Sequence, residues 1–201
     1  MKTLFIPAYK KTEFNADLSK LPKNIAVAYS IQYKELAENL IKKLSKTHTI
    51  YNMGQVLGCS SPKLSKSVKA ILLIGNGRFH AINLALSTKL PIYILEENKL
   101  SLISKQEIEH LEQKRKSAYV NFLNSDKIGI LISTKPGQQN MKTAINIKKA
   151  IKNKKSYLFI ANEINVNEFE NFNEIQSWVN TACPRMDMNS NKIINYKQIK
   201  N

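Results

Sequence analysis

The sequence predicts an α/β protein built of two similar parallel-sheet domains that are joined by a long helix. Short apolar runs alternate along the chain with segments of helical spacing, the pattern of parallel strands covered by helices. Because this alternation occurs twice, we place one domain at residues 1–103, a connecting helix at 104–124 and a second domain at 125–201. A chain of 201 residues is long enough for two small domains with hydrophobic cores.

Five short strands and two helices are expected in the first domain. Val68–Ile74 is a nearly continuous apolar run, which is typical of a parallel strand covered on both faces. Tyr33–Lys46 places leucine and isoleucine on one helical face and lysine on the opposite face, and Phe79–Ser87 can form a second helix. The other expected strands are Thr3–Ala8, Asn24–Ser30, Thr47–Asn52 and Pro91–Leu95.

A long helix and a second alternation follow. Leu102–Leu123 has helical spacing and many charges in its middle, which predicts a largely solvated face and a connecting role. The tail from Asn189 is expected to be poorly anchored. The remaining elements, in order, are a strand at Lys127–Ser133, a helix at Gln139–Lys152, a strand at Ser156–Ala161, a turn or short helix at Asn162–Asn173 and an apolar run at Ile175–Ala182.

The charge balance is strongly basic, with 31 Lys and Arg against 15 Asp and Glu, a net charge of +16. Such an excess is typical of nucleic-acid or ribosome-associated surfaces. However, the lysines are spread along the chain, and aromatic residues do not interleave with them as a base-stacking surface requires. We therefore favour a compositional bias toward lysine and asparagine, and RNA binding is kept as the weaker alternative.

The two cysteines, Cys59 and Cys183, are too few and too far apart for a disulfide framework, which favours a reducing cytoplasmic location. No apolar stretch is long enough to span a membrane, and the N-terminal residues do not have the pattern of a secretory signal. Cys183 ends an apolar run and is followed by Pro184, which we expect to stop any regular element, and by Arg185, whose guanidinium can hold a carboxylate or phosphate. A buried, unreactive cysteine is the alternative interpretation of each thiol.

Two loops between a strand and a helix carry residues suited to ligand binding. Gly75-Asn76-Gly77-Arg78-Phe79-His80 lets backbone N–H groups approach a ligand, and His80 is either a base, a ligand or a structural residue at a helix end. Ser133-Thr134-Lys135-Pro136-Gly137-Gln138 repeats this arrangement, but its spacing is not that of a Walker loop. The signatures of zinc peptidases and serine hydrolases are absent from the sequence, and we assign no acid–base or nucleophilic side chain.

Four segments, in this order and spacing, resemble the diphthamide synthase family, the 2-(3-amino-3-carboxypropyl)histidine synthases. They are Gln55-Val56-Leu57-Gly58-Cys59, Gly75-Asn76-Gly77-Arg78-Phe79-His80, Ser133-Thr134-Lys135-Pro136-Gly137-Gln138 and Val179-Asn180-Thr181-Ala182-Cys183-Pro184-Arg185. The resemblance covers the chain from about Phe5 to Arg185. It implies three similar α/β domains, each giving one cysteine to a central [4Fe-4S] cluster. That cluster cleaves S-adenosylmethionine, and a 3-amino-3-carboxypropyl radical is added to a histidine of translation elongation factor 2.

By this resemblance Cys59 matches the cluster ligand of the family's middle domain and Cys183 that of its last domain. The family's first domain and its cysteine have no counterpart here, so we expect a partner chain to supply them in a homo- or hetero-oligomer. A non-catalytic docking subunit and a fragment are the alternatives. An exposed apolar face is expected where the first domain packs. The S-adenosylmethionine pocket is expected to comprise Gly75, Gly77, Arg78, His80, Thr134, Lys135, Gly137, Gln138 and Arg185.

Overall fold

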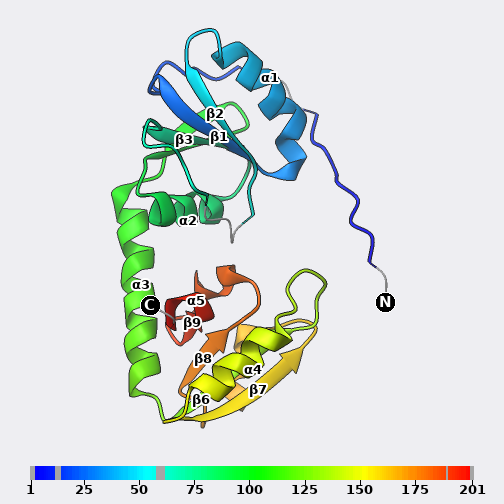
Figure 1. Ribbon diagram of the computed structural model, residues 1–201, viewed down its shortest axis with the longest axis vertical. Coiled ribbons are helices and arrows are strands. Elements are labelled where there is room, and N and C mark those ends of the chain that lie inside the picture. Colours follow the sequence, from blue (N-terminus) through cyan, green and yellow to red (C-terminus); the bar gives the residue numbers. More distant parts are fainter. Residues whose placement is uncertain (1–2, 12–14, 58–61, 189, 200–201) are drawn as a thin grey trace. The chain divides into compact units, whose positions relative to one another are not determined.

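A computed structural model of the chain describes residues 3–11, 15–57, 62–188 and 190–199. The chain divides into two compact units, Met1–Glu109 and His110–Asn201, and each contains its own sheet (Figure 1). The predicted class, an α/β protein with parallel strands, is confirmed. None of the helices in the described ranges is both long and apolar enough to cross a membrane.

Unit 1 holds a five-stranded sheet in the order β2-β1-β3-β4-β5. Its first four strands are parallel to their neighbours, and β5 pairs antiparallel with β4. The elements of this unit, with η denoting a 3-10 helix, are β1 (Asn24–Tyr29), η1 (Ile31–Tyr33), α1 (Lys34–Leu44), β2 (Thr49–Gln55), β3 (Ala70–Ile74), α2 (Arg78–Thr88), β4 (Ile92–Glu96) and β5 (Lys99–Leu102).

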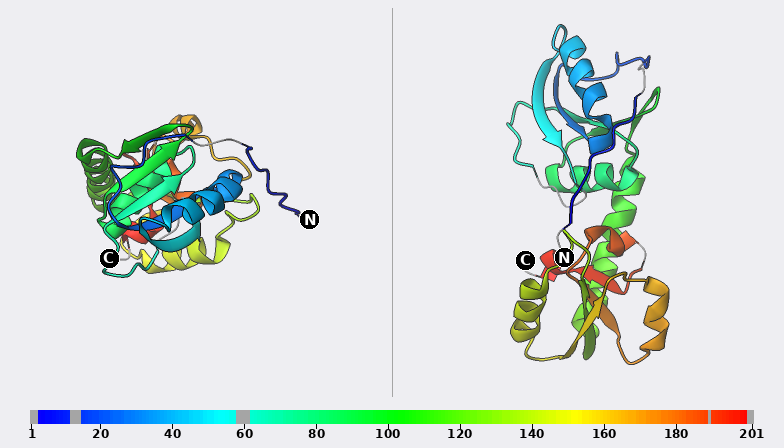
Figure 2. Two further views of the ribbon diagram at one scale, coloured as in Figure 1. Left: turned by 90° about the horizontal axis from the view of Figure 1, so that it is seen from above. Right: turned by 90° about the vertical axis from the view of Figure 1, so that its right-hand side faces the viewer.

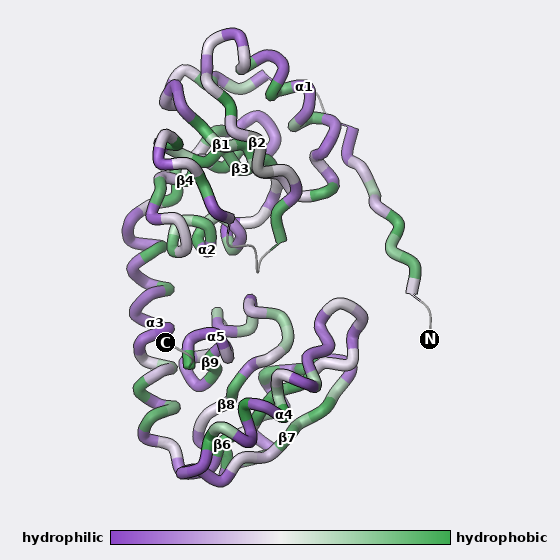
Figure 3. Tube along the Cα trace, in the orientation of Figure 1, coloured by the Kyte–Doolittle hydropathy of each residue, from purple (hydrophilic) through white to green (hydrophobic). Residues whose placement is uncertain are grey.

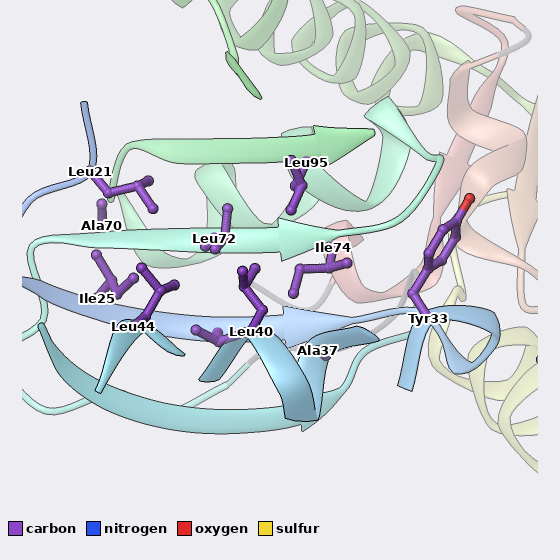
Figure 4. Packing of buried hydrophobic residues seen from close by; sticks show 11 residues of the cluster. Leu21, Ile25, Tyr33, Ala37, Leu40, Leu44, Ala70, Leu72, Ile74 and Leu95 are labelled. Carbon is purple, nitrogen blue, oxygen red and sulfur yellow. The ribbon is translucent and has the colours of Figure 1, made fainter. Parts of the chain in front are cut away.

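The core of unit 1 forms because β1 and β3 are apolar on both faces. All five residues of β3 are buried, as its continuous apolar run predicts. On one face, Ala37, Leu40 and Leu44 of α1, spaced three and four residues apart, pack against the sheet (Figure 4). α2 lies beside β4. The sheet thus fixes where each strand ends, and with it the loops that follow.

Two sequence predictions in unit 1 are wrong. Thr3–Ala8 is not a strand: it pairs with no other described strand, and Leu4, Phe5 and Ile6 are between 73% and 82% exposed. The run has strand-like residues, but pairing requires a neighbouring strand edge, and sequence does not reveal one. In addition, Lys99–Leu102 forms β5, so the long helix begins at Lys105 rather than at Leu102.

The long helix α3 (Lys105–Asn124) begins with a capping box. The backbone N–H of Ser104 donates to Oε2 of Glu107 (3.0 Å), and the N–H of Glu107 donates to the Ser104 hydroxyl (3.3 Å). Only Leu111, Ala118 and Phe122 of this helix are buried, in agreement with a largely solvated helix. Ser104, three residues before Glu107, is the residue that sets where α3 starts.

Unit 2 holds a four-stranded, fully parallel sheet in the order β7-β6-β8-β9. Alternate residues of β6 face opposite sides: Ile128, Ile130 and Ile132 pack with α3 and α4, whereas Leu131 packs with Trp178. The right-hand view of Figure 2 shows α4 and η2 on opposite faces of this sheet. The elements are β6 (Lys127–Ser133), α4 (Met141–Ala150), β7 (Lys155–Ala161), η2 (Val166–Asn171), β8 (Ser177–Asn180), η3 (Pro184–Met188), β9 (Ile193–Asn195) and α5 (Tyr196–Ile199).

The C-terminal tail is the main correction in unit 2. It was predicted to be poorly anchored from Asn189, but Ile193 and Ile194 are fully buried and form β9 beside β8. Polar residues flank this strand on both sides, and three residues are too few for the alternation of apolar and polar residues to indicate a strand. Figure 3 shows hydrophobic residues in strands such as β1 and β8, whereas α1 and α3 contain both hydrophilic and hydrophobic residues.

Candidate functional site

The candidate site of unit 2 lies at the edge where its parallel strands end. The turn carrying Cys183 follows β8, and the loop carrying Thr134 follows β6, the strand next to β8. Because parallel strands all end at one edge of the sheet, these two segments are neighbours there. The hydroxyl of Thr181 confirms this, since it donates to the carbonyl oxygen of Leu131 in β6 (2.7 Å).

Cys183 lies three residues beyond the end of β8 and is half-buried. Its carbonyl oxygen accepts a hydrogen bond from Nδ2 of Asn180 (2.8 Å) and one from the N–H of Met186 (3.2 Å). The prediction that Pro184 stops regular structure is wrong, because Pro184 is the first residue of η3. Proline favours this position since its fixed φ suits the start of a helix. The thiol is therefore presented from a turn with a fixed backbone.

The rest of this turn is held by side chains from three elements. Nδ2 of Asn140, at the start of α4, donates to the carbonyl oxygen of Thr181 (3.0 Å). Nδ2 of Asn195, the last residue of β9, donates to the carbonyl oxygen of Pro184 (2.9 Å). Lys114 of α3 donates through Nζ to the carbonyl oxygen of Met188 (2.5 Å). Several loop carbonyls that would otherwise need water are thus satisfied by protein.

A buried ion pair lies beneath the turn. Nε of Arg115 donates to Oδ2 of Asp187 (2.8 Å), and Asp187 is only 2% exposed. Burial raises the pKa of Asp187 above its usual value, although Arg115 and a hydrogen bond from Asn195 counter part of that effect. Among the described residues, Oδ1 of Asp187 is the buried side-chain atom with no hydrogen-bond partner. The ion pair ties η3 to α3.

The loop after β6 places its predicted ligand residues in several directions. Thr134 is exposed, and its hydroxyl contacts Oδ1 of Asn162 (3.4 Å). Nζ of Lys135 pairs with Oε1 of Glu163 (3.0 Å), just beyond β7, on the side of β6 away from Cys183. Gly137 has φ +79°, a left-handed conformation that glycine adopts at little cost, and Gln138 closes the turn through its N–H to the Lys135 carbonyl (3.0 Å).

The candidate site of unit 1 lies where β3 ends. Gly75 is buried with φ +144°, and a Cβ there would lie 2.5 Å from the hydroxyl oxygen of Ser30. A Cβ on Gly77 would lie 2.6 Å from Nδ1 of His80, so both glycines are needed for the close approach of the loop to its neighbours. Figure 4 shows the Tyr33 hydroxyl at this end of the sheet, where it donates to Oδ1 of Asn76 (2.5 Å).

Arg78 forms an ion pair with Glu107 that the sequence did not indicate. Its Nε donates to Oε1 of Glu107 (2.7 Å), while the guanidinium remains about half exposed. This contact lowers the pKa of Glu107 to about 2, with further help from Ser104. His80 packs its ring edge to face against Phe79. Arg78 therefore links α2 to α3 as well as standing at the strand edge.

Gly58 and Cys59 lie outside the described residues. The strand that leads to them, β2, ends at Gln55 on the same edge as β1 and β3, and the N–H of Val56 continues the pairing by donating to the Tyr29 carbonyl (2.9 Å). Within each unit, the predicted residues that the structure describes lie at the ends of parallel strands. Arg185 is exposed on η3, next to the Cys183 turn.

The chemistry of the described residues fits one ligand of a metal–sulfur cluster. A half-buried thiol on a fixed turn, next to an exposed arginine, is a soft donor of the kind that iron–sulfur clusters use. In the described ranges no group of three or more His, Cys, Asp or Glu side chains forms a complete metal site.

Sequence reasoning missed the residues that shape this turn. Asn140, Asn180 and Asn195 are short polar residues in three different elements, and their roles become visible only when the strands are paired. The one available signal was the position of Asn180, next to the end of an apolar run that leads to Cys183.

Comparisons with known proteins place the chain in a family. Residues 1–197 match a family model described as a diphthamide synthesis protein. A Pyrococcus horikoshii protein named 2-(3-amino-3-carboxypropyl)histidine synthase is 27% identical over 205 residues, covering 92% of this chain and 59% of that protein. A Methanocaldococcus jannaschii protein of the same name is 31% identical, covering 92% and 56%. Subunit 1 of this synthase from Schizosaccharomyces pombe is 33% identical over 141 residues, covering 67% of this chain and 32% of that protein.

Two solved structures have a fold similar to that of this chain. The crystal structure of Dph2 from Pyrococcus horikoshii superposes with a TM-score of 0.78 at 25% sequence identity, covering 91% of this chain and 58% of that chain. The crystal structure of the same protein with a 4Fe-4S cluster matches equally well. The chain thus spans less than three-fifths of the length of these archaeal relatives.

Proposed function

The chain belongs to the diphthamide synthesis protein family, and from this premise we propose that it is the part of a 2-(3-amino-3-carboxypropyl)histidine synthase that holds a [4Fe-4S] cluster through Cys59 and Cys183. In this proposal the first unit is the counterpart of the family's middle domain, and the second unit is the counterpart of its last domain. The enzyme transfers a 3-amino-3-carboxypropyl group from S-adenosylmethionine to a histidine of translation elongation factor 2, in the cytoplasm.

The single observation that carries this proposal is the placement of Cys183. Cys183 lies on a turn whose carbonyl groups accept side-chain hydrogen bonds, at the carboxyl edge of a parallel sheet. Ligands bind at this edge in such folds. A relative matched over 91% of this chain has been solved with a 4Fe-4S cluster. A cysteine kept only for packing has no need of a turn whose carbonyls are held by three separate asparagines.

The remaining cluster ligands must come from outside these 201 residues. The sequence contains two cysteines, and a [4Fe-4S] cluster takes four ligands, or three together with a substrate. We therefore place the third thiolate on a further polypeptide segment or a partner chain and leave one iron for S-adenosylmethionine. When bound, the cluster supplies the electron that cleaves a carbon–sulfur bond of this donor.

The chain's own residues have the tasks of binding and orienting the donor. Arg185 is exposed beside Cys183, and its guanidinium can grip the donor's carboxylate in bidentate fashion. No atom lies within 4 Å of a Cβ built on Gly137, so a ligand can approach the backbone N–H groups there. The other residues that we propose to bind the donor are Gly75, Gly77, Arg78 and His80 of unit 1 and Thr134, Lys135 and Gln138 of unit 2.

Anaerobic iron–sulfide reconstitution followed by visible absorption tests this function. We expect the cluster to form when a cysteine-bearing polypeptide of this family is added, and to be lost in Cys59→Ser and Cys183→Ser. Because Cys183 is only half-buried, its serine variant should keep the thermal midpoint of the native chain. If the native chain binds iron neither alone nor with the added polypeptide, the enzymatic proposal is wrong, and a non-catalytic docking subunit takes its place.

A further inference from the structure

Three asparagine side chains, which we call the asparagine clamp, hold the backbone of the turn that presents Cys183. Asn140 holds the carbonyl of Thr181, Asn180 holds that of Cys183, and Asn195 holds that of Pro184. Three separate elements of the fold, the start of α4, the end of β8 and the end of β9, thus meet on one turn of four residues. This convergence is more than closing a loop requires, since most loops satisfy their carbonyls with water.

Asn195 stands at the centre of this arrangement because every polar atom of its amide is used. Nδ2 donates to the Pro184 carbonyl (2.9 Å) and to Oδ2 of Asp187 (2.7 Å). Oδ1 accepts from Nδ2 of Asn180 (2.7 Å). An amide has two N–H donors, and both are engaged, so no other side chain of this size could make the same three contacts.

Both polar atoms of the Asn180 side-chain amide are also hydrogen-bonded. Its second N–H donates to the Cys183 carbonyl (2.8 Å), and its Oδ1 accepts from the N–H of Ala182 (2.9 Å). The residue is 1% exposed and Asn195 is 7% exposed, so water cannot replace a lost contact without the turn opening. The chain of contacts therefore runs from Asp187 through Asn195 and Asn180 to the backbone of Cys183.

We propose that Asn195 is a positioning residue of the cluster site: through Asn180 and the Pro184 carbonyl it fixes the turn from which Cys183 binds iron. This inference rests on the function proposed above. A cluster fixes the positions of all its thiolates at once, so a turn that is held in place before binding loses less conformational entropy on loading. Asn195 touches neither the thiol nor a substrate and acts only through the turn.

The sharpest test replaces Asn195 by aspartate, which keeps the shape but removes both donors. In the apo form of the full 201-residue chain, we expect the amide protons of Ala182 and Met186 to exchange about tenfold faster, as a local opening that has lost two hydrogen bonds should. Amide protons of β6, such as that of Ile130, should keep their rates. These exchange rates require no cluster.

The second readout is the cluster itself. In the reconstituted assembly with the added cysteine-bearing polypeptide, Asn195→Asp should shift the low-temperature electron paramagnetic resonance spectrum of the reduced cluster and lower the iron bound per chain by about half or more, the effect of weakening one of its ligands. Asn121→Asp is the matched control, because it also removes a side-chain N–H bond to a carbonyl, that of Asn191, in the same unit. The control should leave both readouts unchanged.

The double variant Asn195→Asp/Asp187→Asn separates positioning from stability. Exchanging donor and acceptor restores the contact between positions 195 and 187 and keeps the net charge, but leaves the Pro184 carbonyl without its bond. Position 187 as an amide keeps a hydrogen-bond acceptor for Arg115 but loses the charge pair, so we expect the thermal midpoint to recover only in part. The fast amide exchange and the altered spectrum should persist. Recovery of all three quantities together would show a merely structural role and overturn the proposal.

Failure of this inference and failure of the proposed function are distinguishable. If the native assembly binds a cluster, but Asn195→Asp leaves its spectrum and the turn's exchange rates unchanged, the inference is wrong and the function stands. If the native assembly binds no cluster, the function is wrong, and with it the role of Asn195 in iron binding.

Discussion

Single residues decide how closely the backbone segments of this protein can approach one another. Gly129 in β6 is one such residue, because a Cβ there would overlap the indole ring of Trp178 and lie 3.1 Å from the ring of Phe159. Trp178 is stacked on Phe169 with the ring centroids 4.2 Å apart, so it has little room to move aside. The absence of one methyl group thus permits the aromatic cluster that covers this face of the sheet.

We expect Gly129→Ala to lower the free energy of unfolding by about 1–3 kcal/mol, the usual cost of overpacking a filled core. Chemical denaturation monitored by Trp178 fluorescence measures this change. Gly137→Ala is the comparison, since no atom lies within 4 Å of a Cβ there and only the φ of +79° opposes it. A smaller loss at Gly129 than at Gly137 would contradict the steric argument.

Arg185 is the residue for which we expect an effect on substrate and not on stability. Under the function proposed above, replacing it by alanine should raise the KM for S-adenosylmethionine about tenfold in the assembled enzyme and change kcat less, because a charge-assisted contact to a non-reacting carboxylate is lost. Arg185→Lys keeps the positive charge but cannot make the bidentate contact of a guanidinium, so its KM should lie between those of the native protein and the alanine variant. Steady-state kinetics with varied donor concentration measure the effect, and an unchanged KM would remove Arg185 from the pocket.

At the scale of elements, α3 is stabilised at its first turn by both a cap and an ion pair. Glu107 completes the capping box with Ser104 and also accepts from Arg78 of α2. A carboxylate in the first turn is favoured by the helix dipole as well. One side chain therefore joins the start of the helix to the edge of the sheet in unit 1.

This joint has a definite pH dependence. The pKa of Glu107 falls from 4.5 to about 2 on folding, so its contribution to stability is complete above 4.5 and is lost as the pH falls through about 2. Since Arg78 is half exposed, we expect Glu107→Gln to lower the free energy of unfolding at neutral pH by only about 1 kcal/mol. Urea titrations from neutral to acidic pH should show the two proteins converging on the acid side.

Glu109→Gln is the matched control for that titration. It changes the same residue type in the same helix, but its pair with Lys105 is long (3.5 Å) and exposed. We expect no measurable loss of stability at any pH. A constant difference between Glu107→Gln and the native chain down to the acid limit would show that the loss is due to something other than the charge.

At the scale of the whole molecule, the net charge of +16 is the most evident property. Several of the basic side chains are engaged within the fold, such as Lys154, which donates to the carbonyls of Leu123 and Ser125, and Arg115 on Asp187. This use of cations as structural donors agrees with the view that the excess of lysine reflects composition.

We therefore expect RNA binding to be only non-specific. The affinity for a mixed-sequence RNA oligonucleotide should fall more than about tenfold between roughly 50 and 200 mM salt and be independent of sequence, because phosphate contacts release counterions. Fluorescence anisotropy at several salt concentrations measures this. An affinity that survives high salt and depends on sequence would revive RNA recognition as a function.

The sequence by itself determined the α/β class, most of the strands and helices, the existence of the long helix α3 and the resemblance in four motifs. It could do so because apolar periodicity and glycine-bearing turns are local signals, as in the run Ala70–Ile74 and at Gly75. The tertiary structure alone decided that Thr3–Ala8 is unpaired, that Ile193–Asn195 is a strand and that Arg78 binds Glu107.

The same division holds at the candidate site. Cys183 and Arg185 could be chosen from the sequence because a cysteine, proline and arginine after an apolar run are distinctive residue types. Asn140 and Asn195 could not, since an asparagine is common in loops and its partners lie 41 and 11 residues away along the chain. Which amide reaches which carbonyl is fixed only when the strands pair, because strand order brings these distant residues together.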